Sequence, residues 1–420
     1  MSTQLCDVAA CVTGYAARLH AAIGARHQVA SPLGAWLLLA LAGPASSGSD
    51  RGTLEEILGC DVDAASHAAA ALLADLHPLV ASAAAVWTTP GHQFSEAFHR
   101  WQASLPADVS GGDLPDQAGL DQWAREHTFG LIDRFPVQWI PDLYLVLASA
   151  LATKVSWQVP FALAPASWLG EQSAWSRKLS MVLRAPDPLP GRPPGHRQFI
   201  AATEQAGDVA VHVASAQDGL LVFSVAADPS VPALSVLVAA HRIGCAQAVG
   251  APVQERSLSE LPLGPGPAWM LREESSASER DICTAVLPAW QAESEHELVH
   301  PDLGFAAVAH ALAPAGGPWQ ANQAAMARYS RFGFEAAAVS AVARALSFRA
   351  PTSRRRVADL RFAHPYAVVA VTIDGNGPVP PTAARRLGWH GLPVFSAWIA
   401  EPADADSDWG APDPDQSKTL

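Results

Sequence analysis

Apolar residues recur at helical spacing in the first part of the chain. From Leu5 to Ile23 they fall on one side of a helix, and from Gly34 to Leu41 they occupy nearly every position. The first pattern predicts an amphipathic helix and the second a buried one. Ser31 and Pro32 precede the buried helix and suit its N-cap and its first helical position. A further helix is expected from Thr53 to Leu58.

Strand patterns follow later in the chain. The β-branched and aliphatic run from Tyr144 to Val155 predicts a buried strand. Shorter apolar runs predict further strands over Val209–Val213, Leu220–Val225 and Leu234–Ala239. The stretches Arg184–Arg197 and Leu261–Pro267, rich in Pro and Gly, predict loops. No internal repeat and no clear linker divides the chain, so we expect one α+β domain over residues 1–402 and an acidic, disordered tail over residues 403–420.

Composition narrows the class of protein. The chain has 420 residues, of which 50% are hydrophobic and 16% charged, so a large core can form. Its net charge of −13 argues against a broad nucleic-acid surface. There is no apolar run of the ~18 residues that a membrane span needs, and residues 1–20 lack the features of a signal peptide. Five sparse cysteines predict reduced thiols. We therefore expect a cytoplasmic protein, with secretion left open if the true start differs.

One short motif matches a metal-site pattern. The residues HELVH, from His296 to His300, fit the H-E-x-x-H pattern, in which two histidines one helical turn apart bind zinc and the glutamate acts as a base. That pattern needs a helix through both histidines, whereas Pro301 pushes His300 out of the helical conformation. A surface turn is favoured, and no metal or cofactor is expected. A zinc hydrolase using His296, Glu297 and His300 remains an alternative.

A small, apolar segment stands directly before a basic one. Six of the thirteen residues from Phe334 to Leu346 are alanine, the best helix former. The basic run from Ser353 to Arg356 predicts an exposed loop, which would be a cutting site for trypsin-like proteases or a binding site for an anion. A helix over the alanine-rich segment is one interpretation, and an extended, insertable strand is the other.

Several segments, in the same order along the chain, resemble conserved segments of the serpins. They are Ser31–Gly59, Asp121–Phe135, Ser149–Phe161, Val286–Trp290, Asp302–Phe305, Arg331–Val342, Phe362–Val371 and Leu392–Pro402. The resemblance covers most of residues 5–402, and the chain looks like a divergent, prokaryotic-type member. It implies a single domain in which helices pack around three β-sheets, with an exposed reactive loop at about residues 331–361.

The resemblance implies suicide inhibition of a serine or cysteine protease. The protease attacks a bond in the reactive loop and forms an acyl-enzyme. The freed loop then inserts as a new strand into the central sheet, and the tethered protease is distorted before it can complete hydrolysis. The chain itself supplies no catalytic group, so it is not expected to be an enzyme. A monomer is expected, and an insertable strand also permits loop–sheet polymers.

The hinge of the loop begins at Gly333. A strand alternates its side chains between two faces. One face carries Phe334, Ala336, Ala338, Ser340 and Val342, and the other carries Glu335, Ala337, Val339 and Ala341. Small side chains suit a strand that must enter between two paired strands, because larger ones clash before a gap has opened.

Two counts predict different scissile bonds. Counting from Gly333 with the family's spacing gives Ser347–Phe348, which suits a chymotrypsin- or elastase-like protease. Counting back from Pro365 gives Arg354–Arg355, which suits a trypsin-like protease. The first count is favoured because the inserted strand must span a sheet of fixed length, at about 3.3 Å per residue. The alternative bond stays open.

Positions that control insertion depart in part from the family pattern. Members carry serine, asparagine and histidine behind the sheet opening, and the matching positions here are Ser31, Gly34, Ser149 and Gln323. Lys154 and Trp157 are retained where the loop begins to enter, although ordinary strand packing also explains them. Phe334 replaces the usual Thr or Ser, and its ring is large for fast insertion. A serpin fold that does not inhibit and acts as a binding or scaffold protein is therefore the alternative.

Overall fold

The chain forms two compact units. The computed structural model describes residues 7–75, 77–92, 94–140, 143–153, 155–186, 195–217, 219–276, 278–312, 317–333, 353–373 and 388–405. The first unit comprises residues 1–153, 292–327 and 370–397, and the second comprises residues 154–291, 328–369 and 398–420. Each unit is thus built from segments far apart in the sequence.

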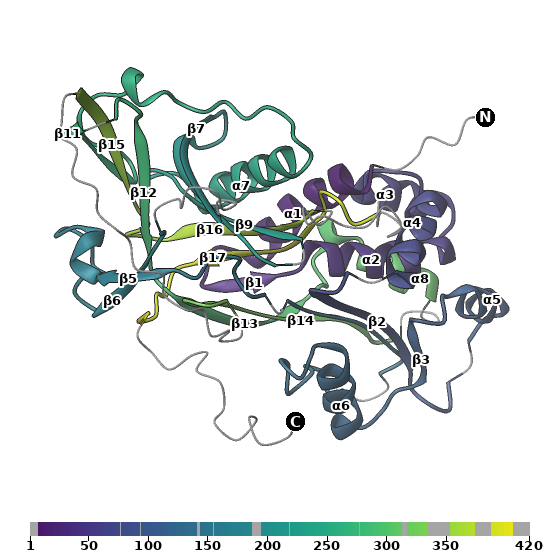
Figure 1. Cartoon of the computed structure of the whole chain (residues 1–420). Helices are drawn as coiled ribbons and strands as arrows, with labels where there is room; N and C mark the ends of the chain where they lie inside the picture. Colours follow the sequence, from purple (N-terminus) through teal and green to yellow (C-terminus); the bar gives the residue numbers. More distant parts are fainter. Residues whose placement is uncertain are drawn as a thin grey trace, which may run out of the picture. The chain divides into compact units, whose positions relative to one another are not determined.

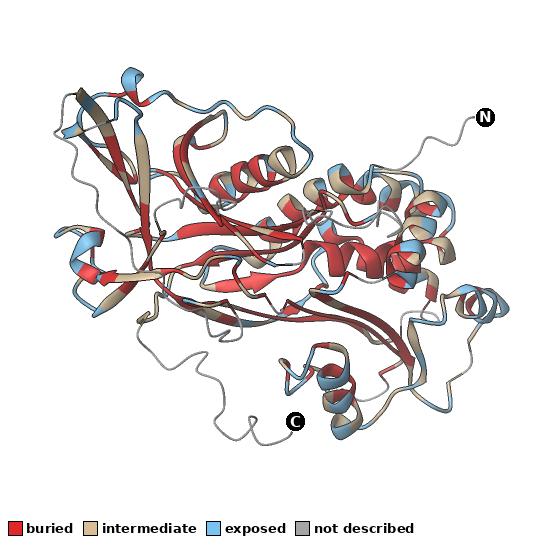
Figure 2. Cartoon of the chain, viewed as in Figure 1, coloured by how far each residue is buried: buried red, intermediate tan, exposed pale blue. Residues whose placement is uncertain are grey.

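Helices make up much of the first unit (Figure 1). They are α1 (Val8–Ile23), α2 (Pro32–Ala42), η1 (Gly43–Ala45), α3 (Gly48–Leu58), α4 (Val62–Ala74), α5 (Glu96–Ser104), α6 (Gln117–His127), η4 (Pro301–Leu303) and α8 (Phe305–Leu312). The predicted helices within α1, α2 and α3 are confirmed. Helix α2 is buried along its whole length, as its uniformly apolar sequence predicts (Figure 2).

A five-stranded sheet has the order β13-β14-β4-β2-β3. Its strands are β2 (Val80–Thr88), β3 (Ser110–Asp113), β4 (Leu145–Thr153), β13 (Trp290–Glu297) and β14 (Trp319–Tyr329). All nine residues of β4 are buried, which confirms the predicted strand in Tyr144–Val155. Strands β4 and β14 pair directly and run parallel, from Leu145 opposite Trp319 to Ala152 opposite Met326.

The remaining strands form two six-stranded sheets. One has the order β10-β11-β15-β12-β6-β5 and lies in the second unit. Its strands are β5 (Ala162–Pro165), β6 (Met181–Arg184), β10 (Gly264–Pro265), β11 (Trp269–Ser276), β12 (Ile282–Leu287) and β15 (Ser353–Arg361), with η2 (Ala166–Leu169) and η3 (Leu258–Glu260) beside them in sequence. The other has the order β1-β17-β16-β9-β8-β7.

This last sheet contains an antiparallel meander. Its strands are β1 (Gln28–Ala30), β7 (His196–Thr203), β8 (Gly207–Ser215), β9 (Leu220–Ala226), β16 (Tyr366–Thr372) and β17 (Pro393–Ile399). Strands β7, β8 and β9 pair antiparallel, which confirms the two strands predicted within β8 and β9. Helix α7 (Ala233–Ala248) packs on β9 in the second unit.

Four sequence predictions need correction. Leu234–Ala239 belongs to helix α7, because its apolar run continues at helical spacing to Ala248. Ser353–Arg356 begins strand β15 and is not a loop. Leu261–Pro267 contains the two-residue strand β10. The expected tail is anchored at its start, because the Asp404 carboxylate accepts hydrogen bonds from the backbone of Ser180 and Met181, and only residues 406–420 lie outside the described part.

None of the described helices is by itself long and apolar enough to span a membrane. Helices α3 and α4 reach the required length and hydropathy only as a pair, with a bend of 54° between them.

Candidate functional site

The chain reverses direction directly after β14. In the turn Ser330–Gly333 of the second unit, the Gly333 N–H donates to the Ser330 carbonyl at 3.4 Å, and the Ser330 hydroxyl donates to the Gly333 carbonyl. Gly333 then forms an antiparallel bridge with Ser156. The residue predicted to begin the hinge is therefore already paired with the segment that follows β4.

Gly333 is required by the close approach of two backbones. Its φ of +105° lies in a region that residues with a β-carbon rarely adopt. A β-carbon at this position would lie 2.1 Å from the Val155 carbonyl oxygen, which is a severe clash. The hinge glycine predicted from the sequence is explained by this contact.

Trp157 holds the turn in place. Its indole is 2% exposed, and Nε1 donates to the Ser330 carbonyl at 2.9 Å. Its backbone N–H donates to the Phe332 carbonyl at 3.1 Å. The indole also packs on Tyr329, with ring centroids 4.8 Å apart. Trp157, a predicted control position, is therefore bound to the hinge turn through both its backbone and its side chain.

A buried histidine pair lies beside this turn. His196 Nε2 is 2.6 Å from the Val159 carbonyl, and His196 Nδ1 is 3.1 Å from His212 Nε2. His212 Nδ1 is 3.5 Å from the Tyr329 hydroxyl. One proton arrangement satisfies all three contacts: Tyr329 donates to His212, His212 donates to His196, and His196 donates to the Val159 carbonyl. Both imidazoles are neutral in this chain of hydrogen bonds.

Burial makes the neutral state of both histidines strongly preferred. Desolvation lowers the pKa of His196 to about 4, against the opposing hydrogen bond to Val159. Desolvation and the neighbouring His196 lower the pKa of His212 well below its ordinary value. The ring of Phe161 packs against both imidazoles, with centroids 4.4 Å and 5.4 Å away. The apolar strand sequence VAVHV around His212 is a signal for a buried histidine that the sequence interpretation did not use.

The predicted polar cluster forms in the first unit. The Gln323 amide accepts from the Ser31 N–H at 2.9 Å and donates to the Ser31 carbonyl at 2.8 Å. The Ser31 hydroxyl caps α2 through the Gly34 N–H and donates to the Val394 carbonyl. Gln323 also lies opposite Ser149 in the pairing of β14 with β4. The four positions named from the sequence therefore lie together.

Gly34 and Ser149 are in especially tight contact. A β-carbon on Gly34 would lie 2.6 Å from the Ser149 hydroxyl oxygen. That hydroxyl is buried and has no hydrogen-bond partner among the described residues. Ser149 is consequently the one member of the cluster whose polar group is not satisfied by the others, so substitution there removes no hydrogen bond that the described residues make.

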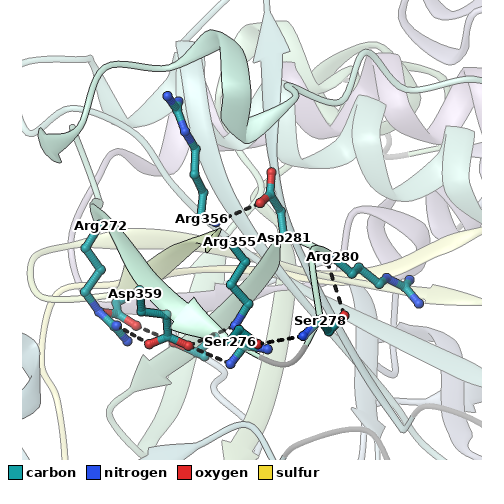
Figure 3. Close-up of polar contacts among 10 residues, drawn as sticks. Arg272, Ser276, Ser278, Arg280, Asp281, Arg355, Arg356 and Asp359 are labelled. Atoms are coloured by element: carbon teal, nitrogen blue, oxygen red, sulfur yellow. Dashed lines mark hydrogen bonds and ion pairs between the residues drawn. The ribbon is translucent and has the colours of Figure 1, made fainter. Parts of the chain in front are cut away.

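The arginines from Arg354 to Arg356 lie in the part of β15 that pairs with β11. Strand β15 pairs antiparallel with β11 over eight residue pairs and parallel with β12 over five. Arg355 makes two hydrogen bonds to Glu274, at 2.6 and 2.8 Å. The Arg356 backbone donates to Asp281, as Figure 3 shows, and its guanidinium donates to the carbonyls of Leu258 and Leu261. Arg354, by contrast, has a side chain that is 82% exposed.

The H-E-x-x-H residues do not converge on a metal. His296 lies in strand β13, where its side chain is buried and its Nε2 is 2.8 Å from the Val29 carbonyl. His300 precedes η4 and accepts from the Asp302 N–H. The expectation of a surface turn is thus correct for His300 and wrong for His296. No group of three or more potential metal ligands occurs in the described part of the chain.

Some predicted site residues lie outside the described residues. They are the hinge from Phe334 to Ser340, the favoured scissile bond Ser347–Phe348, and Lys154. The described residues on either side of this loop end at Gly333 and begin at Ser353.

Comparison with known proteins identifies the fold. No protein-family model matches the sequence, and no curated protein matches it. Among solved structures, the native state of Tengpin, a thermophilic serpin, is 12% identical, with a TM-score of 0.64 over 96% of each chain. Human thyroxine-binding globulin, in complex with thyroxine, is 12% identical, with a TM-score of 0.62 over 94% of this chain and 97% of its own. The serpin of the trematode Schistosoma haematobium is 12% identical, with a TM-score of 0.58 over 94% and 99%. The chain has the serpin fold, as the sequence resemblance predicted.

Proposed function

We propose that this chain inhibits a serine or cysteine protease by insertion of its cleaved reactive loop between β4 and β14. The observation that carries the proposal is the direction of the chain at Gly333. Strands β4 and β14 run parallel, whereas Gly333 is antiparallel to Ser156, which follows β4. A strand that continues in this direction would pair antiparallel with both of its neighbours.

The free energy for insertion comes from the sheet. Insertion replaces one parallel pair by two antiparallel pairs, and antiparallel pairing is slightly more stable per residue. The alanine-rich segment adds buried surface and a second set of backbone hydrogen bonds. Before cleavage the loop is tethered at Gly333 and at β15, so the stable arrangement is separated from the native one by a barrier. The protein contributes no catalytic group, and the protease performs the covalent step.

The favoured scissile bond is Ser347–Phe348. Arg354 and Arg355 lie in β15 and pair with β11, and Arg355 is additionally bound to Glu274. A protease must bind the backbone around its target bond in an extended, unpaired form. A site upstream of β15 therefore suits cleavage better than one inside the strand, and it suits a chymotrypsin- or elastase-like protease.

Phe334 supports a second candidate function. A phenyl ring at the second hinge position is bulky for a strand that enters a closed sheet. If insertion is blocked, the fold would act as a binding or scaffold protein. Human thyroxine-binding globulin, which has a similar structure, is complexed with thyroxine. One fold can host different functions, so the test must measure insertion itself.

The test is limited cleavage with chymotrypsin, followed by measurement of the melting temperature. If the loop inserts, the cut protein should melt about 5 °C or more above the intact protein, because the new strand adds several kcal/mol of stability and each kcal/mol raises the melting temperature of so long a chain by about 1 °C. The two fragments should co-elute in gel filtration. In parallel, incubation with active chymotrypsin should yield a complex that survives boiling in detergent, because an acyl-enzyme is covalent.

Chymotrypsin with a chemically blocked active serine is the control and should form no such complex. An unchanged melting temperature together with no covalent complex would contradict the proposal and favour a binding role. A rise in melting temperature without a complex would support insertion but would require proteases of other specificity to be tried.

A further inference from the structure

The second unit contains a partly open pocket on the β15 sheet. Its volume is about 470 Å³, within the range of roughly 300–1,000 Å³ that small-molecule sites occupy. Strands β6, β11, β12 and β15 and the short helix η2 contribute to its wall. The polar or aromatic lining residues used below are Trp168, Arg184, Arg272, Thr284, Asp359 and Arg361.

The strand register places these side chains on one face of the sheet. Arg361 of β15 is opposite Val286 of β12, and Val286 is opposite Arg184 of β6. Directly paired residues point to the same face, so the two arginines flank Val286. Asp359 lies two residues before Arg361 and is opposite Thr284, so this pair shares the same face. The pocket floor therefore alternates apolar and charged groups across three strands.

The acidic group in the pocket is already neutralised. Asp359 accepts from Arg272 Nε at 3.1 Å and from the Thr284 hydroxyl at 3.0 Å, and Figure 3 shows Arg272 directed at Asp359. The lining contains three arginines against this one carboxylate. Arg272 is also paired with Glu274, so the excess of positive charge in the lining comes from Arg184 and Arg361. Such an excess concentrates anions from solution.

One arginine has unused hydrogen-bonding capacity. Nε of Arg361 is buried and has no hydrogen-bond partner among the described residues. A buried guanidinium nitrogen without a partner is costly, and a carboxylate is the acceptor that fits the guanidinium fork best. Because Nε itself is covered, a carboxylate in the pocket would bind Arg361 through its other guanidinium nitrogens.

An aromatic side chain forms another part of the wall. Trp168 is 50% exposed, which is unusual for so large a ring, and the Arg184 guanidinium lies 5.8 Å from its ring centre. Such a ring offers a flat apolar surface to a planar ligand.

We propose that this pocket binds a small aromatic carboxylate. Arg361 and Arg184 receive the carboxylate, and Trp168 packs against the aromatic part.

Isothermal titration of the full chain with 2-naphthoate, and with the neutral 2-naphthamide, tests the proposal. Naphthoate should bind at least tenfold more tightly than naphthamide, because only the carboxylate pairs with the arginines. Arg361→Gln and Trp168→Ala should each weaken naphthoate binding at least fivefold. Arg354→Gln is the matched control, because Arg354 lies on the same strand outside the pocket, and its binding should stay within twofold of wild type.

Several outcomes would overturn the proposal. They are no binding of naphthoate to the wild type, equal binding of naphthoate and naphthamide, and an equal loss in Arg354→Gln and Arg361→Gln. Circular dichroism checks the fold of each variant. Should Arg361→Gln fail to fold, Arg184→Gln on the neighbouring strand replaces it with the same expected loss.

Discussion

A single missing β-carbon, at Gly333, allows the chain after β14 to lie against the chain after β4. Gly333→Ala should destabilise the protein by about 2–4 kcal/mol, because it combines a disfavoured backbone conformation with a clash against the Val155 carbonyl. Urea unfolding measures the change. Gly264→Ala is the matched control, since Gly264 has a similar φ of +110° and open space around its position, and it should lose only about 1 kcal/mol. Equal losses of stability in the two variants would mean that the close approach at Gly333 does not contribute to the free energy of unfolding.

The buried histidine pair predicts a dependence of stability on pH. The pKa of His196 is lowered from 6.5 to about 4 in the folded protein, so the unfolded chain binds a proton that the folded one does not. This stability is fully present above pH 6.5 and is lost as the pH falls from 6.5 towards 4. The free energy of unfolding should drop by about 1–2 kcal/mol per buried histidine between pH 6.5 and pH 5.

Urea unfolding at pH 7, 6 and 5 measures this slope. His196→Gln should start less stable, because its contact with the Val159 carbonyl changes, but its stability should vary less with pH. His67→Gln, at an exposed position of α4, should keep the wild-type slope. The idea fails if His196→Gln and wild type lose stability in parallel over this range.

Individual residues also show where the sequence alone predicted the structure correctly and where it did not. Ser31 was predicted to be the N-cap of α2, and it is, because Ser followed by Pro is a local signal. The arginines from Arg354 to Arg356 were assigned to a loop because a charge run in isolation is usually solvated. Their partners Glu274 and Asp281 lie more than 70 residues away in the sequence, so no local pattern could reveal the pairing.

At the scale of elements, the two faces of the proposed inserted strand should differ in their exposure to solvent. Glu335 and Ala337 share one face, which must reach solvent because of the charge, so Ala336 is expected on the buried face. Ala336→Arg should abolish the rise in melting temperature after loop cleavage, and Ala337→Arg should retain most of it. Both variants should be cut at the same rate, which gel electrophoresis measures. Equal behaviour of the two variants would contradict an alternating, inserted strand.

The pairing of β15 predicts where trypsin cuts. Arg344 and Arg349 precede β15, whereas Arg354, Arg355 and Arg356 lie within it. Trypsin should cut after Arg344 or Arg349 at least tenfold faster than after the three strand arginines, because those must first separate from β11. Mass spectrometry of the early products identifies the bond. Dominant early cleavage after Arg354, Arg355 or Arg356 would show that β15 is not stably paired in solution.

Helix α7 shows why part of a helix can be predicted as a strand. Its first residues, from Leu234 to Ala239, form a short apolar run rich in valine and leucine, which fits a buried strand as well as a buried helix. Apolar residues recur at helical spacing as far as Ala248, and the packing of α7 on β9 favours the helix. The length of the whole segment would have distinguished this helix from a strand.

At the scale of the whole molecule, the order of segments was more informative than any one of them. The sequence contains no single strong motif, yet the segments that resemble serpins follow one another correctly. The three solved structures described above are each only 12% identical to this chain. The control cluster around Ser31 and Gln323 was predictable because it derives from this order. The histidine pair and the arginine-lined pocket were not, since each joins residues from strands whose neighbours only the fold defines.

Strand β15 also has a mechanical consequence. It is held by β11 on one side and by β12 on the other, and its register with β11 extends over its first eight residues. A tension applied to Ser353 along the strand would load these hydrogen bonds together in shear, instead of opening them one after another like a zipper. Strand β15, which follows the loop, is therefore expected to keep its place after the loop is cut. The segment on the Gly333 side is the one expected to move.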